Sequence, residues 1–227
     1  MRVDLNCDLG ECSGGDVTSG ITDIMESITS ANIACGVHAG DVRTMRAVVK
    51  LAKQFRVAIG AHPGLDDPFG FGRREVFIEP LEIVELVKVQ LETLDRVATS
   101  EGCALRHVKP HGALYNMASR DQKYAEPIVR AVVDTNPRLI LFGLSGSELI
   151  KAGKAAGLSV ASEVFADRVY EATGLLTPRS VEGSVIENSQ QVVDRAITMI
   201  RDGEVKARGG ERVKLDVDTI CIHCLLY

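Results

Sequence analysis

Apolar and polar positions alternate along the chain in two distinct periods. Short apolar runs of strand length recur at 2–11, 28–35, 56–62, 103–111, 138–143, 158–167 and 218–223. Between them lie longer stretches in which apolar residues return every three or four positions, at 41–55, 79–102, 119–136, 145–157 and 188–203. That spacing is typical of helices that bury one face. Strands that take turns with helices in this way predict a parallel sheet.

The boundaries of these elements carry local signals. Asp41 is placed to cap the helix at 41–55, and Gly157 and Gly203 follow the last turns of two other helices. No linker-like stretch and no repeat of fixed period interrupts the alternation. We therefore expect one α/β domain over residues 1–227. Seven or eight strand–helix units favour a single TIM-like β/α barrel of about seven strands, with an open doubly wound sheet as the alternative.

Composition excludes several classes of function. The 227 residues are 45% hydrophobic and 25% charged, with a net charge of −5 and no basic run, so we expect no nucleic-acid partner. Aromatic residues make up only 4% and Trp is absent, which argues against base-stacking surfaces. No apolar run approaches the roughly 18 residues that a membrane span requires. We expect a cytoplasmic protein with no membrane contact.

The six cysteines are scattered among apolar strands of a large chain without a signal peptide, so we expect free thiols and no disulfides. The C-x-x-C at 221–224 has no helix after it, which disfavours a redox site.

Polar residues gather where the predicted strands end. His38, His62, His111 and His223 all lie at or just past the C-terminal end of a strand. In a parallel barrel these ends share the face that carries active sites. A single histidine is more often structural than catalytic, but four at separate strand ends indicate a shared functional pocket.

Other strand-end groups offer acid–base and anion-binding chemistry. Asp8 and Glu11 share the first loop, where paired carboxylates bind a metal or share a proton, or simply lie in a solvated loop or helix cap. Lys109 enters the predicted mouth and suits an anion, although a surface lysine is the alternative. Asp167 and Arg168 form an adjacent pair, whose guanidinium suits a carboxylate clamp or a structural salt bridge.

Several catalytic motifs are absent from the sequence. There is no Walker phosphate loop, no G-x-G-x-x-G that opens a helix, no G-x-S-x-G nucleophile turn and no H-E-x-x-H zinc motif. Nucleotide binding by a standard loop and serine-nucleophile chemistry are therefore disfavoured.

The strand ends together resemble those of a known family. The segments "DLNCDLGE", "SANIACGVHAGD", "GAHPGLDDPFGFGRR", "VKPHGALYN" and "EVFADRVYEATGLLTPRS" are similar in order and content to the family of 5-oxoprolinase A subunits, also called LamB/YcsF, from residue 3 to about residue 223. The resemblance implies a glycoside-hydrolase/deacetylase-like barrel, a type also common in carbohydrate metabolism. It further implies ATP-dependent hydrolysis of 5-oxo-L-proline to L-glutamate, carried out with partner subunits B and C that use the nucleotide.

On this basis we expect two groups of site residues. The catalytic group is Asp8, His62, Lys109, His111 and Glu163, and the substrate-binding group is Asn6, His38, Asp41, Tyr115, Asp167, Arg168 and His223. Arg168 or Lys109 would hold the substrate carboxylate.

Two alternatives stay open. A metal-dependent deacetylase-like hydrolase would hold a divalent ion with Asp8, His38 and His62 or a similar set. A non-catalytic subunit would instead deliver substrate to its partners. The family continues beyond the last strand with a His-Gly-Asp turn, whereas here Cys224 stands at the glycine position and no Asp follows. We therefore expect a C-terminus that is short relative to the family.

Overall fold

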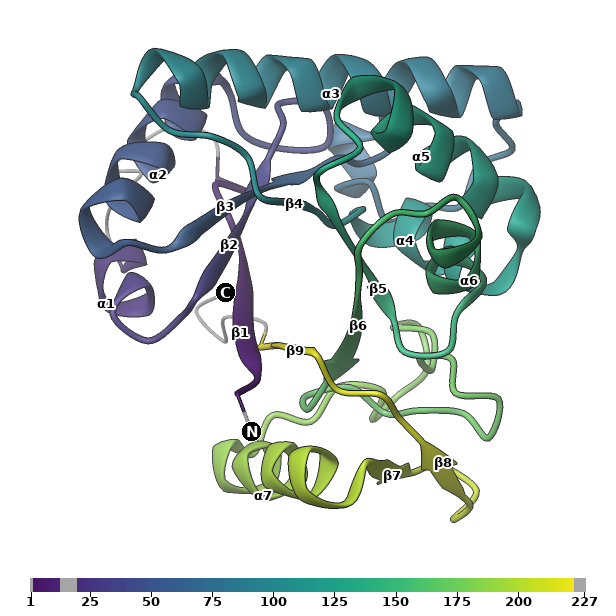
Figure 1. Ribbon diagram of the computed structural model, residues 1–227. Coiled ribbons are helices and arrows are strands. Elements are labelled where there is room, and N and C mark those ends of the chain that lie inside the picture. The colour runs from purple at the N-terminus through teal and green to yellow at the C-terminus, as the bar shows by residue number, and fades with distance from the viewer. Residues whose placement is uncertain (1, 13–19, 223–227) are drawn as a thin grey trace.

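Seven short parallel strands close into a barrel in the computed structural model, which describes residues 2–12 and 20–222 (Figure 1). They are β1 (Asp4–Leu9), β2 (Ser30–Ala34), β3 (Ala58–His62), β4 (His107–Val108), β5 (Ile140–Leu144), β6 (Val160–Phe165) and β9 (Thr219–Cys221). Strand β9 closes the barrel because Thr219 pairs with Asp4 of β1 on one side and with Glu163 of β6 on the other. The predicted seven-stranded β/α barrel and its closing strand are confirmed.

Helices surround the barrel on its outer side. They are α1 (Ile21–Met25), α2 (Val42–Phe55), α3 (Pro80–Ser100), α4 (Gly112–Arg120), α5 (Gln122–Thr135), α6 (Glu148–Ala155) and α7 (Ser189–Asp202), with a short 3₁₀ turn at Pro68–Gly70. In Figure 1, α3 spans one side of the barrel and α7 covers the opposite side. The expected caps are present: Asp41 accepts a hydrogen bond from the Thr44 backbone N–H, and Gly203 ends α7 in the left-handed conformation.

Two elements differ from the sequence prediction. The segment after β4 contains Pro110 and Gly112, residues typical of a turn, yet it enters helix α4 directly, with His111 as its N-cap. Gly112 makes this possible, because its φ is +53° and a Cβ there would lie 2.5 Å from the Gly72 carbonyl oxygen. The second difference is an antiparallel hairpin, β7 (Glu204–Lys206) and β8 (Arg212–Lys214), which lies between α7 and β9. Each of its strands has only three residues, too few for an alternation of polar and apolar positions to be recognised in the sequence.

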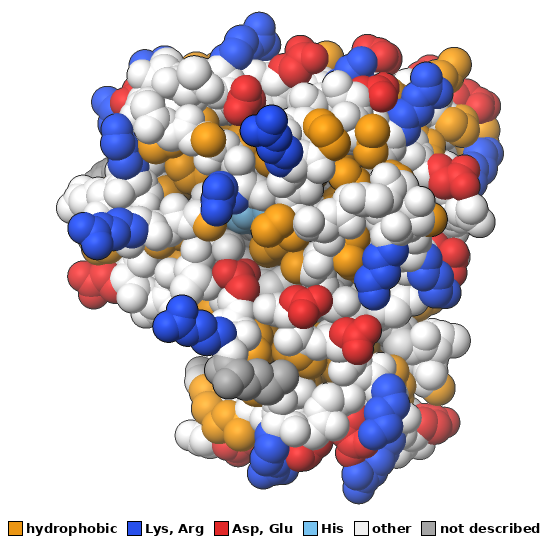
Figure 2. Space-filling model, viewed as in Figure 1, with side chains coloured by type: hydrophobic (Ala, Val, Ile, Leu, Met, Phe, Trp, Pro, Cys, Tyr) orange, Lys and Arg blue, Asp and Glu red, His pale blue; other side chains and the backbone are white. Residues whose placement is uncertain are grey.

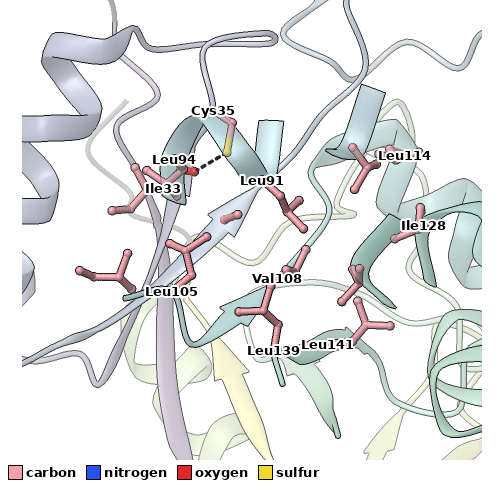
Figure 3. Packing of buried hydrophobic residues seen from close by; sticks show 14 of the residues in the cluster. Ile33, Cys35, Leu91, Leu94, Leu105, Val108, Leu114, Ile128, Leu139 and Leu141 are labelled. Atoms are coloured by element: carbon pink, nitrogen blue, oxygen red, sulfur yellow. Dashed lines mark hydrogen bonds between the residues drawn. The ribbon is translucent and has the colours of Figure 1, made fainter. Parts of the chain in front are cut away.

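The main core lies between the strands and the helices. Figure 3 shows side chains of β2, β4 and β5 meeting those of α3, α4 and α5 in one cluster. Helix α3 supplies Ile83, Val87, Leu91 and Leu94, all fully buried and spaced on one face. The cysteines of the described residues are free thiols, as expected, and Cys35 donates to the Ile33 carbonyl oxygen at 3.3 Å within this cluster. Cys224 lies outside the described residues.

On the face shown in Figure 2, acidic and basic side chains are interspersed and form no broad patch of one sign. Among the described helices, none combines the length and the apolar character needed to cross a bilayer.

Truncation of the α3 core face tests this packing. Because Leu94 is fully buried, Leu94→Ala should lower the free energy of unfolding by about 2–5 kcal/mol, through lost burial and the cavity left behind. Val89→Ala on the same helix is the control, since Val89 is 55% exposed and its truncation should change stability by less than about 0.5 kcal/mol. Urea unfolding measures both. Equal effects for the two variants would contradict the assigned core face.

Candidate active site

Three histidines and one glutamate meet at the C-terminal ends of the first barrel strands. Glu11 follows β1, His38 follows β2, His62 ends β3 and His111 caps α4 after β4. One ligand atom from each of the four lies within 4.8 Å of the others. The three imidazoles are at most 4% exposed. The expectation that His38, His62 and His111 share one place is confirmed, and we call this group, with Glu11, the His–Glu cluster.

The cluster is tightly arranged. The His38 and His111 rings stack at 3.9 Å between centroids, and His62 meets them edge-on. Glu11 Oε1 lies 3.1 Å from His111 Nδ1, 3.5 Å from His38 Nε2 and 3.7 Å from His62 Nε2. Two glycines permit the stack, because a Cβ on Gly64 would lie 2.5 Å from His38 Nδ1 and one on Gly72 would lie 3.0 Å from His111 Cδ2.

Backbone carbonyls fix the orientation of two of the rings. His62 Nδ1 lies 2.7 Å from the Lys109 carbonyl oxygen, and His111 Nε2 lies 2.8 Å from that of Phe71, so each of these nitrogens carries a proton and donates it. The remaining nitrogens, His62 Nε2 and His111 Nδ1, face each other at 3.0 Å. Both would present lone pairs if both rings were neutral. The arrangement therefore requires a proton or a cation between them.

The third ring of the cluster has unsatisfied groups. Neither ring nitrogen of His38 has a hydrogen-bond partner among the described residues, although both are buried. Buried polar groups are nearly always satisfied, so an unpaired imidazole is a mark of a missing ligand. Burial lowers the pKa of His38 to about 4, against the opposing effect of Glu11, so this ring is neutral near pH 7 and can offer a lone pair.

The other members of the cluster have shifted pKa values as well. Burial lowers the pKa of His111. Burial also acts to lower that of His62, but the Asp8 carboxylate outweighs it and the pKa is raised. For Glu11, burial acts to raise the pKa, and contacts with His111 and His38 more than offset this, so the carboxyl pKa is held well below its usual value. Glu11 is thus ionised, and His62 is the one imidazole of the cluster whose surroundings favour the protonated form.

Beneath the cluster lies a buried ionic network around Lys109. Its Nζ lies 2.8 Å from Asp8 Oδ1 and 2.9 Å from Glu163 Oε1. Tyr115 donates to Glu163 Oε2 at 2.8 Å, and Asn6 donates to Glu163 Oε1 at 2.9 Å. Burial acts to lower the pKa of Lys109, but Asp8 and Glu163 raise it well above its usual value, so Lys109 stays charged. It organises the two carboxylates and does not serve as a base.

Asp8 connects this network to the cluster. Its Oδ2 lies 3.4 Å from His62 Nε2, while its Oδ1 receives bonds from Lys109 and from Asn32 at 2.8 Å each. The donor set expected for a metal was Asp8, His38 and His62. A similar set was also allowed, and the described residues group Glu11 and His111 with the two histidines, while one Asp8 oxygen is engaged by Lys109 and Asn32.

Sequence reasoning missed Asn32 and placed Asp41 at the site, where the structure does not bring it. Asn32 holds Asp8 and accepts from His107, the fifth histidine, which stacks on Phe142 deeper in the barrel. A polar residue in the apolar run "SANIAC" was the available signal. Asp41 is exposed and caps α2, so the structure does not bring it to the cluster. His223 lies outside the described residues.

The remaining expected residues lie on the loop after β6. Arg168 is 4% exposed, and its guanidinium donates to the carbonyl oxygens of Thr177 at 2.6 Å and Ser184 at 3.4 Å. Burial, followed by the neighbouring Arg179, lowers the pKa of Arg168 to about 10. Asp167 beside it is 2% exposed.

A cavity of about 360 Å³ opens above these groups. Its lining combines Asp8, Glu11, His62, Lys109, His111 and Tyr115 with Arg73, Arg168 and Arg179 from two loops. This volume lies near the lower end for small-molecule sites. The site can therefore hold a small ligand between a cluster of N and O donors and a group of guanidiniums.

Removal of the buried cation tests the ionic network. Lys109→Met should lower the free energy of unfolding by about 3–5 kcal/mol, because Asp8 and Glu163 would remain buried without their partner. Chemical denaturation at pH 7 measures this. The exposed pair Lys151–Glu148 provides the control, since Lys151→Met should cost less than about 1 kcal/mol. A Lys109→Met variant as stable as the parent chain would show that the network is not stabilising.

Comparison with known proteins agrees across most of the chain. The LamB/YcsF family model matches residues 3–224. The chain is 51% identical over 223 residues to a protein of Bacillus subtilis (strain 168) named as the A subunit of 5-oxoprolinase, covering 98% of this chain and 87% of that one. It is 52% identical over 221 residues to the protein of the same name from Geobacillus kaustophilus (strain HTA426), covering 97% and 86%.

Solved structures show the same fold. The lactam utilization protein from Thermus thermophilus superposes with a TM-score of 0.90 at 43% identity, over 98% of this chain and 90% of that one. A putative cellobiose-phosphate cleavage protein from Enterococcus faecalis V583 gives a TM-score of 0.55 at 14% identity, over 98% and 79% of the two chains. At that identity the second likeness concerns the fold alone.

Proposed function

The chain belongs to the LamB/YcsF family, and we propose that it is the A subunit of a 5-oxoprolinase that opens the lactam ring of 5-oxo-L-proline to give L-glutamate. The observation that supports this most strongly is the His–Glu cluster at the edge of a cavity of small-molecule size. The relatives, named for 5-oxoprolinase and for lactam utilization, supply the substrate class.

Ring opening adds one water across the amide bond. A C–O bond forms at the lactam carbonyl, the C–N bond breaks, and the nitrogen gains a proton to become the amine of glutamate. The reaction needs a group that takes a proton from water, a group that returns one to the nitrogen, and stabilisation of the oxyanion. Asp8, His62 and His111 line the cavity, and of these Asp8 is the group placed to move a proton, because each histidine ring has one nitrogen on a backbone carbonyl and the other inside the His–Glu cluster.

Within this group, Asp8 is the carboxylate suited to move the proton. Its Oδ2 faces His62, and its Oδ1 is fixed by Lys109 and Asn32. Lys109 keeps Asp8 in place and favours its ionised form, and Glu163 holds Lys109 from the other side with the help of Tyr115. In this assignment Lys109 and Glu163 position the base, while Asn6 and Tyr115 complete the floor of the site.

The His–Glu cluster fits a divalent metal. Glu11, His38, His62 and His111 would hold the ion, which is the mixed N and O donor set that zinc and similar ions accept. Three observations support this assignment. The buried His38 nitrogens have no hydrogen bond with the described residues, the lone pairs of His62 and His111 face each other, and a backbone carbonyl orients each of these two rings. When bound, such an ion supplies Lewis-acid polarisation of a carbonyl or of water.

The partners of the chain follow from the same proposal. The lactam is a stable amide, so coupling to ATP is chemically reasonable, and subunits B and C would bind and use the nucleotide. This sequence carries none of the standard phosphate-binding motifs. The present chain would then contribute the ring-opening site, and the product is released as glutamate.

Reconstitution tests the proposed function. The purified chain combined with the B and C subunits of a close relative, ATP and 5-oxo-L-proline should form glutamate, and omission of this chain should abolish it. An N-acetylated sugar in the same assay tests the deacetylase alternative. Absence of glutamate with all subunits folded and assembled would overturn the proposal.

Loss of the cluster histidines should abolish the reaction. His62→Ala and His111→Ala should each reduce glutamate formation in the reconstituted complex to below about 1% of the parent rate, because both rings face the reacting groups. Circular dichroism should show retained folding, and metal content, measured on the same samples, should fall in both. Arg46→Ala, which removes a surface pair with Glu101, is the control. Turnover at the parent level in either histidine variant would remove that residue from the mechanism.

The isolated chain should not hydrolyse ATP. Since the phosphate-binding motifs are missing, phosphate release by the purified chain should equal the buffer blank, with and without 5-oxo-L-proline. Addition of subunits B and C should raise phosphate release above the blank. Steady phosphate release that co-purifies with this chain through two unrelated columns would contradict the assignment of ATP to the partners.

A further inference from the structure

Two arginines on separate loops face the cavity without a carboxylate partner. Arg73 lies on the loop between β3 and α3, and Arg179 lies on the loop between β6 and α7. Both line the cavity that contains the His–Glu cluster. Neither forms an ion pair with another described residue, and Arg73 is seen only against the Phe71 ring, at 4.8 Å.

Neighbouring arginines behave differently. Arg74, next in the chain to Arg73, is paired with Asp67, and Arg120, which also lines the cavity, is paired with Glu75 through both of its terminal nitrogens. The positive charge of these two is therefore neutralised locally. Arg73 and Arg179 keep theirs, and they direct it at the cavity.

The third arginine of the cavity increases this unbalanced charge. Arg168 is buried beside them, and two of its donors are used to hold the carbonyl oxygens of Thr177 and Ser184. Burial lowers the pKa of Arg179 and Arg73 lowers it further, while Asp167 and Asp8 act in the opposite direction. Like charges that line one cavity are stabilised when an anion binds between them.

The lining of the cavity also carries negative charge, from Asp8 and Glu11, which lie with His62 and His111. A small molecule with one carboxylate is attracted to the guanidiniums and repelled by Asp8 and Glu11, which favours one orientation of the bound molecule. In 5-oxo-L-proline the carboxylate and the lactam carbonyl are on the two ring carbons that flank the nitrogen. If the arginines hold the carboxylate, the carbonyl would be directed to the His–Glu cluster.

We propose that Arg73 and Arg179 bind the substrate carboxylate and thereby set the specificity of the site for carboxylate-bearing lactams. This inference rests on the proposed function for the identity of the lactam. Arg168 holds the loop that carries Arg179 and adds its charge. Paired guanidinium–carboxylate bonds are strong and directional, so these two residues would favour a lactam with a free carboxylate over its neutral amide.

The test compares two substrates that differ only in that group. 5-Oxo-L-proline and its neutral amide, 5-oxo-L-prolinamide, are given to the reconstituted complex that contains the parent chain, Arg73→Ala, Arg179→Ala, Arg179→Lys or, as the control, Arg46→Ala. For 5-oxo-L-proline, each alanine variant at 73 or 179 should raise KM at least tenfold while kcat changes less than threefold. For the amide, kcat/KM should stay within twofold of the parent value. For 5-oxo-L-proline, the KM of Arg179→Lys should lie between those of the parent chain and Arg179→Ala. Arg46→Ala should change the kinetics of neither substrate, because Arg46 pairs with Glu101 outside the cavity.

Calorimetric titration of 5-oxo-L-proline into the isolated chain separates this inference from the proposed function. The expected result is binding by the parent chain that weakens at least tenfold in Arg73→Ala and Arg179→Ala. If the complex opens no lactam but this arginine-dependent binding is present, the proposed function fails and the anion site stands. If the complex opens 5-oxo-L-proline and the arginine variants keep the parent KM and affinity, or lose both substrates equally, the inference is overturned. Absence of binding and of turnover with the parent chain overturns both.

Discussion

The buried ammonium of Lys109 is the constraint on which the rest of the site depends. A lysine that is 2% exposed is stable only when its charge is balanced, and here Asp8 and Glu163 provide the balance. Asp8 belongs to β1, Glu163 to β6, and Lys109 follows β4, so one cation joins strands from different parts of the barrel. The Lys109 carbonyl oxygen also orients His62. The same residue therefore fixes the base candidate and one ring of the His–Glu cluster.

The His–Glu cluster brings several hydrogen-bond acceptors together, and a proton or a cation must lie between them. Two backbone carbonyls direct the lone pairs of His62 and His111 toward each other, and Glu11 brings an ionised carboxylate to the same point. Only a proton or a cation resolves this contact. The backbone at Gly64 and Gly72 approaches the rings so closely that a Cβ at either position would crowd His38 or His111. This close packing against the rings explains why the loop between β3 and α3 carries glycine at positions 64 and 72.

The alternation of apolar runs was sufficient to predict the barrel, because period and element length are set by local geometry. It was not sufficient at Gly112, where proline and glycine indicated a turn. The contact with the Gly72 carbonyl, far away in sequence, makes that glycine the start of α4. Strand ends located His38, His62 and His111 correctly, since parallel strands share one active face. They also suggested Asp41, which instead satisfies the backbone of α2.

Other site residues depend on contacts that no local pattern reveals. Glu11 was recognised as a neighbour of Asp8, but only the fold shows that Glu11 faces three histidines while Asp8 is held by Lys109. Arg73 and Arg179 look like ordinary loop residues in the sequence. Their role depends on the absence of an ion pair with the described residues, which becomes visible only when neighbours such as Arg120 are seen to have one.

A crystal structure of the chain with 5-oxo-L-proline and a divalent metal soaked in would test the assigned site most directly. We expect one ligand in the cavity, with its lactam carbonyl toward His62 and His111 and its carboxylate toward Arg179. We also expect metal density among Glu11, His38, His62 and His111. A ligand bound outside this cavity, or bound with its carboxylate against Glu11, would contradict this assignment.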